Sequence, residues 1–199
     1  MRSRVVVLGI ALTAGLVGTP AAACPDVTPW EVVRGSLAPA GGCGAWVLTT
    51  NGVRRGYSYG ELRYAQPITI PYEVSVTWQR LGADARSMDL RVLGASVLVG
   101  EERVALYVEG DDARFAADGW RPVPGLHAHD EHRVSVKQDA RSIALTVDGT
   151  VVATWAFEAR AATGPLVLGL KGAPGYRARA VFRDLQIAQS AAASPVRPR

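Results

Sequence analysis

Residues 142–155 read SIALTVDGTVVATW, and this stretch decides the fold class. Apolar residues alternate with polar or small ones on both sides of Asp148 and Gly149, which is the pattern of two half-buried strands. Both central residues tolerate the positive φ angles that a two-residue hairpin turn requires. The stretch therefore predicts a β-hairpin whose turn is Asp148-Gly149.

The same alternation continues on both sides of this hairpin. Upstream, apolar residues fall at every second position in three runs: 74, 76 and 78, then 88, 90 and 92, then 104, 106 and 108. Downstream, two further runs occupy about 165–171 and 179–187. Gly, Pro, Asn and Asp separate the runs, and no segment has a helical period. From Trp30 to Ile187 the sequence predicts an all-β, antiparallel, two-sheet jelly-roll sandwich.

Composition agrees with a single globular domain. The chain has 199 residues, of which 48% are hydrophobic and 20% are charged, so disorder, collagen and a disulfide-dense miniprotein are excluded. There are 22 Lys and Arg against 18 Asp and Glu, and the basic residues occur in ones and twos with acids between them. No basic stripe follows from this pattern, and we expect no nucleic-acid partner.

The N-terminal segment resembles a secretory signal. Arg2 and Arg4 precede an apolar run at residues 5–17, and small residues at 19–23 follow as a cleavage region. Thirteen residues are too few to span a bilayer, which takes about 20. We expect a signal peptide at 1–23, a β-sandwich at 24–188, a disordered tail at 189–199, and a periplasmic or extracellular protein with no transmembrane segment in the mature chain.

Two readings remain open for Cys24 and Cys43. After cleavage behind Ala23 they could form a disulfide that pins the N-terminal arm. Alternatively, Cys24 carries the lipid of a bacterial lipoprotein and Cys43 is unpaired. Lipoprotein signals normally have a large aliphatic residue three positions before the cysteine, whereas this chain has Ala21. The disulfide is therefore favoured.

The C-terminal half resembles a known superfamily. The segments HRVSVK at 132–137, IALTVDG at 143–149, GPLVLG at 164–169 and VFRDLQI at 181–187 are similar to the closing strands of concanavalin A-like lectin/glucanase domains. That superfamily includes laminin G-like modules, family 16 glycoside hydrolases and bacterial keto-disaccharide hydrolase domains. The resemblance implies the two-sheet fold and a glycan as ligand, such as a cell-envelope polysaccharide.

The enzymes of family 16 carry two glutamates in a Glu-x-Asp-x-x-Glu motif, and this chain has none. Glu101 and Glu102 are adjacent, so on a strand they would point to opposite faces. Glu61, Glu73 and Glu109 stand alone in the sequence. We therefore predict no catalytic residues. A glycoside-cleaving enzyme of the same fold, or a structural or protein-binding envelope domain, is the alternative.

The best candidate for binding is the run RRGYSYGELRY at 54–64. On a strand, Tyr57, Tyr59, Glu61 and Arg63 share one face. Aromatic rings cover the apolar C–H side of a sugar ring, and charged groups bond to its hydroxyls. The competing interpretation is an ordinary exposed sheet face with solvated charges.

No cofactor is predicted. His127, His129 and His132 are close in sequence, but their spacing does not place all three around one metal ion, so a polar loop is the favoured interpretation. Asp111, Asp112 and Asp118 could contribute to a calcium loop, but their pattern is incomplete. The tryptophans fall into two groups: Trp120 lies in a loop and could be core or ligand platform, and the others are expected in the core (Trp30, Trp46, Trp78 and Trp155).

Overall fold

The computed structural model describes residues 30–41, 44–109, 114–116, 118–127, 129–159 and 161–189. The predicted signal segment, Cys24, Cys43, Asp111, Asp112 and the residues after 189 lie outside this part of the chain. Within it, all regular elements are strands, as expected from the alternation. The described residues contain no helix long and apolar enough to cross a membrane.

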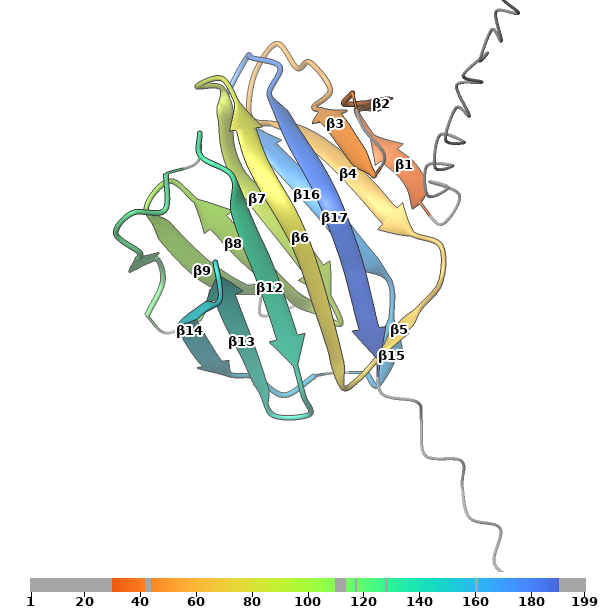
Figure 1. Cartoon of the computed structure of the whole chain (residues 1–199), viewed down its shortest axis with the longest axis vertical. Coiled ribbons are helices and arrows are strands. Elements are labelled where there is room, and N and C mark those ends of the chain that lie inside the picture. Colours follow the sequence, from red (N-terminus) through yellow and green to blue (C-terminus); the bar gives the residue numbers. More distant parts are fainter. Residues whose placement is uncertain are drawn as a thin grey trace, which may run out of the picture.

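The strands form two large antiparallel sheets, called A and B below, that lie face to face. Sheet A has the order β1 (Trp30–Arg34), β4 (Ser58–Tyr64), β16 (Leu166–Gly172), β7 (Ala85–Val92), β8 (Ala95–Gly100), β9 (Arg103–Val108) and β10 (Arg114–Phe115), and β11 (Arg121–Pro122) also pairs with β9. Sheet B has the order β14 (Thr150–Ala156), β13 (Ser142–Val147), β12 (His132–Gln138), β6 (Tyr72–Leu81), β17 (Arg179–Gln189), β3 (Ala45–Thr49) and β2 (Ser36–Pro39). Sheet B, which contains β6, β12 and β17, is in front in Figure 1. A small third sheet joins β5 (Ile68–Thr69) to β15 (Thr163–Gly164). The predicted two-sheet jelly-roll sandwich is confirmed.

The hairpin that decided the fold class forms as predicted. Strands β13 and β14 are joined at Asp148 and Gly149, whose φ angles are 48° and 81°. The Asp148 carboxylate also accepts a hydrogen bond from the Arg133 backbone N–H at 2.8 Å and lies 2.7 Å from His132 Nδ1. Asp148 therefore connects the turn to the neighbouring strand β12, and these contacts explain the aspartate as a structural residue.

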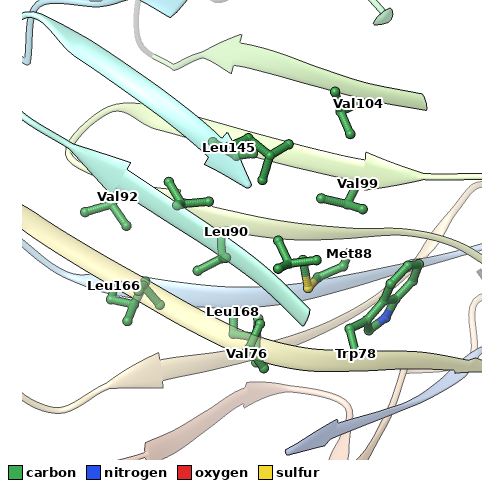
Figure 2. Close-up of a cluster of buried hydrophobic side chains, with 14 of the residues drawn as sticks. Val76, Trp78, Met88, Leu90, Val92, Val99, Val104, Leu145, Leu166 and Leu168 are labelled. Atoms are coloured by element: carbon green, nitrogen blue, oxygen red, sulfur yellow. The ribbon is translucent and has the colours of Figure 1, made fainter. Parts of the chain in front are cut away.

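The core lies between the two sheets, and Figure 2 shows how side chains from both meet there. Val76 and Trp78 point inward from β6, and Met88, Leu90 and Val92 point inward from β7. Each such side chain contributes about 1.5–3 kcal/mol when it is fully buried. The predicted runs on β6 and β7 are confirmed, whereas the last residue of the third run, Val108, is only partly buried.

The tryptophans divide differently from the prediction. Trp78 and Trp155 are buried, as expected. Trp30 and Trp46 are half-buried, because Trp30 lies on the edge strand β1 and Trp46 lies on β3, next to the short edge strand β2. Trp30 still packs against the core and has its ring 5.2 Å from that of Tyr64.

Candidate functional site

Strand β4 carries most of the predicted binding residues on the outer face of sheet A. Gly60 and Leu62 point into the core, so Tyr59, Glu61 and Arg63 face outward together. Tyr57 lies in the loop just before β4 and is 47% exposed. Its ring centre is 3.9 Å from Nζ of Lys171. Lys171 lies on the neighbouring strand β16, where it pairs with Tyr59 of β4. The structure thus places all four predicted residues along the same face.

Two strands away, the fold adds a pair of residues that the sequence analysis did not select. Asp89 and Arg91 face outward from β7, and Arg91 Nη2 lies 2.8 Å from Glu61 Oε1. Arg91 Nε lies 3.0 Å from Asp89 Oδ2. One guanidinium therefore contacts both carboxylates. Glu61 stands alone in the sequence, but the strand order β4-β16-β7 brings it together with these distant residues.

Gly169 lies on β16, between β4 and β7, and leaves space for the Asp89 side chain. It pairs with Glu61 on one side and with Asp89 on the other. A Cβ atom on Gly169 would lie 1.7 Å from Asp89 Oδ1. The Asp89 carboxylate therefore lies across β16 at a position that only glycine leaves open.

The setting of the cluster shifts the acid–base properties of its members. Burial raises the pKa of Asp89 to about 6; Arg91 acts against this shift, and Glu61 and Glu109 add to it. Burial works to lower the pKa of Arg91, but Asp89 and Glu61 outweigh it, so that pKa is raised. Arg91 thus stays charged, and Asp89 exchanges a proton near pH 6.

A pocket of about 280 Å³ adjoins the cluster through Arg91. Its polar groups come from Arg91, Glu109 and Thr163, and the rest of the lining is apolar or glycine (Leu93, Gly94, Ala161, Gly164, Pro165 and Val167). Leu93 adopts a φ of 52°, which is rare for a bulky side chain. A Cβ on Gly164 would lie 2.7 Å from Leu93 Cδ2, so this wall of the pocket is closely fitted.

Aromatic residues lie on the far side of the cluster, over β8 and β9. The ring centres of Tyr107 and Phe115 are 5.3 Å apart, and those of Phe115 and Trp120 are 6.0 Å apart. Arg103 stacks on Trp120 at 4.6 Å, and Phe115 is 42% exposed. Trp120 is therefore part of the outer surface of sheet A and not of the core between the sheets.

The outer face of sheet B differs in kind. Arg133 donates to Ser75 Oγ at 2.8 Å and to Gln186 Oε1 at 3.0 Å, and Ser135 donates to Glu73 at 2.6 Å. Its polar side chains thus bond mainly to one another. Among the described residues, no aromatic side chain occupies an outward position of this sheet. Sheet A is the better candidate for ligand binding.

The other candidate residues serve the fold. Glu101 and Glu102 form the turn between β8 and β9, with Glu102 at a φ of 49°, so the expectation that they lie on a strand is wrong. His132 is buried, with its ring nitrogens near Asp148 and the His127 carbonyl oxygen. Asp118 forms an ion pair with Arg121. In the part of the chain that the structure covers, no group of three His, Cys, Asp or Glu residues is arranged to hold a metal ion.

Comparisons with known proteins identify the fold. No family profile matches the sequence, and no curated protein matches it. Among solved structures, the carbohydrate-binding module CBM66 from Bacillus subtilis is 13% identical with a TM-score of 0.61, and the match covers 81% of this chain and 96% of that one. A beta-1,3-glucanase from Mycobacterium marinum is also 13% identical, with a TM-score of 0.60 and coverage of 85% and 95%. A Bacillus licheniformis beta-glucanase is 12% identical, with a TM-score of 0.55 and coverage of 84% and 94%.

These proteins define the structural class of the chain as a concanavalin A-like jelly-roll sandwich. The resemblance drawn from residues 132–187 is therefore confirmed at the level of the fold. At these identities the likeness concerns the fold alone, and function has to be argued from the site.

Proposed function

We propose that this protein binds carbohydrate on the outer face of sheet A, centred on Glu61, Arg91 and Asp89. The observation that carries the proposal is this partly buried charged cluster, which lies beside a pocket and between two groups of aromatic side chains. Carboxylates accept and guanidinium groups donate the hydrogen bonds that orient sugar hydroxyls. Aromatic rings on either side supply platforms for the apolar faces of further sugar rings.

The pocket beside Arg91 would hold one end of such a ligand. Its volume of about 280 Å³ is near the lower limit, about 300 Å³, of ordinary small-molecule sites. A single sugar ring suits it better than a long chain does. From there a glycan could extend over the cluster toward Tyr59 and Tyr57.

The structural neighbours support this proposal by their names, since one is a carbohydrate-binding module and others are glucanases. Export would bring the site to polysaccharides outside the cell. The basic, apolar and small-residue segments at residues 1–23 support that location.

A glycan array tests the proposal. We expect the full chain to bind at least one glycan, and Tyr57→Ala with Tyr59→Ala to abolish that binding while the melting temperature stays nearly constant. A matched control, Lys137→Ala with Thr146→Ala on sheet B, should bind like the unmodified chain. Absence of binding across a broad array would contradict the proposal and favour a structural or protein-binding envelope domain.

A second candidate function is cleavage of the bound glycan, and Asp89 favours it. Glu61 and Asp89 contact the same guanidinium, which brings two carboxylates into one cluster. Retaining glycosidases act with a pair of carboxyl groups about 5 Å apart. A pKa of about 6 lets Asp89 hold a proton for donation near neutral pH.

Binding and cleavage separate experimentally. If the protein is an enzyme, it should release reducing ends from the glycan that it binds, and Asp89→Asn should stop release without preventing binding. If the unmodified chain binds a glycan and leaves it intact over a range of pH around 6, the enzymatic candidate is wrong and the binding function stands.

A further inference from the structure

We propose that the glycan is polyanionic and is engaged by a basic surface at one end of sheet A, an inference that rests on the proposed carbohydrate-binding function. This surface, here called the basic loop surface, consists of Arg54, Arg55, Tyr57, Lys171, Tyr176 and Arg177. It comes from the loop before β4 and the loop after β16. The two loops lie side by side at the upper end of Figure 1, in orange and blue.

The charge of these two loops is one-sided. Residues 51–60 and 171–180 contain five Arg and Lys and no Asp or Glu. Ion pairs elsewhere engage Arg34, Arg80 and Arg91, but no such pair involves these five cations anywhere in the described residues. Asp84 lies beside the second loop, where its backbone carbonyl oxygen accepts a hydrogen bond from the Ala173 N–H. Within the described ranges, the surface therefore keeps an excess of positive charge that is not engaged in ion pairs.

Buried hydroxyl groups hold the two loops in place. The Ala178 N–H donates to Thr50 Oγ1 at 2.8 Å, and Ser58 Oγ donates to the Tyr176 carbonyl oxygen at 2.7 Å. Since the Ser58 proton is used there, Thr50 Oγ1 donates to Ser58 Oγ, 2.8 Å away. Thr50 is 2% exposed and Ser58 is fully buried. This relay fixes the loops before a ligand arrives, which lowers the entropy lost on binding.

Two tyrosines complete the surface. Tyr57 is 47% exposed and Tyr176 is 61% exposed. Their rings offer platforms for sugar C–H faces, and the guanidinium groups beside them suit carboxylate or sulfate groups, which they bind through paired hydrogen bonds. Through Tyr57 and Lys171 the surface continues into the outer face of sheet A. A polysaccharide with regularly spaced negative charges fits this combination.

A nucleic acid fits less well. Single strands also bind to cations and aromatic rings. However, the face that continues from this surface carries the carboxylates of Glu61 and Asp89, which accept hydrogen bonds from hydroxyl groups. A polysaccharide offers several hydroxyls on most of its residues, whereas a nucleic acid offers at most the 2′-hydroxyl of RNA. The chain as a whole is nearly balanced, with 22 basic and 18 acidic residues.

The test compares polysaccharides that differ only in charge. The full chain is titrated with polygalacturonate and with its methyl ester, and with dextran sulfate and dextran, at low ionic strength and near 0.15 M salt. We expect at least one charged polymer to bind about tenfold more tightly than its uncharged partner, with salt weakening the binding. Which of the two charged polymers binds better distinguishes carboxylates from sulfate esters.

Variants assign the binding to the surface. Arg54→Gln with Arg55→Gln should reduce binding of the charged polymer about tenfold and leave the melting temperature unchanged, because both side chains are exposed and unpaired in the described structure. Arg177→Gln should act in the same direction. Lys137→Gln with Arg141→Gln removes the same charge from exposed positions on and after β12 and should have little effect.

Three results would overturn the inference. Equal binding of a charged polymer and its uncharged partner would contradict it while leaving the proposed function intact. A single-stranded oligonucleotide that binds as tightly, with the same loss in the Arg54 and Arg55 variant, would show a surface for polyanions in general. Failure to bind these polymers and every glycan of the array would remove both proposals together.

Discussion

The Asp89 carboxylate lies on the outer face of sheet A in surroundings that disfavour its charge. Its pKa is about 6 in the folded chain, against about 3.9 when unfolded. Between these values the folded protein holds a proton that the unfolded chain has released, so its stability falls as pH rises. Two pKa units correspond to about 3 kcal/mol, which is an upper value since the side chain is 19% exposed.

Asp89→Asn should remove this penalty. We expect the variant to be more stable than the unmodified chain at pH 7, with the difference disappearing as pH falls toward 4. Melting temperatures measured from pH 4 to 7 test this expectation, with the exposed Asp130→Asn as control. A variant that is less stable at pH 7 would show that the ion pair with Arg91 outweighs burial.

Gly169 should be intolerant of any side chain. Gly169→Ala would place a methyl group 1.7 Å from Asp89 Oδ1, and we expect a loss of about 1–3 kcal/mol in the free energy of unfolding. In an Asp89→Ala background the same change should cost much less, because the obstructing carboxylate is gone. Urea denaturation of the four chains gives the coupling. Equal costs in both backgrounds would contradict the described packing.

At the scale of elements, the hydroxyl relay should control the loops of the basic surface. Ser58→Ala leaves the Thr50 hydroxyl proton without its acceptor and the Tyr176 carbonyl oxygen without its donor, which costs about 1–3 kcal/mol. Hydrogen exchange at the Ala178 and Gly175 amides should accelerate, whereas exchange in the β13–β14 hairpin should not. Ser36→Ala on β2, an exposed position, is the control. Unchanged exchange at both amides would rule out the relay as the support of these loops.

The two hairpin turns show which elements the sequence could predict. Asp148-Gly149 is recognisable because both residues tolerate positive φ. Leu93-Gly94 joins β7 to β8 in the same way, with φ angles of 52° and 84°, but leucine gives no such signal. Strand alternation likewise placed Tyr59, Glu61 and Arg63 on one face. It could not show that β7 lies two strands from β4, because strand order depends on pairing between distant segments, so Asp89 and Arg91 were missed.

At the scale of the whole molecule, the two outer faces differ in chemical character. Sheet B bonds its polar side chains to one another, whereas sheet A exposes aromatic rings, a pocket and a charged cluster. Composition could not predict that the cations of the basic loop surface gather at one end of sheet A, because they come from segments about 120 residues apart. The balanced total charge concealed a local excess.

The most direct test of the account is a titration followed by nuclear magnetic resonance, using the glycan that binds best on the array. We predict that shifted amide signals concentrate on β4, β16, β7 and the loops of the basic surface, with Tyr59, Asp89 and Arg91 among them. Shifts concentrated instead around Ser75, Arg133 and Gln186 on the outer face of sheet B would contradict the assignment of sheet A as the carbohydrate-binding face.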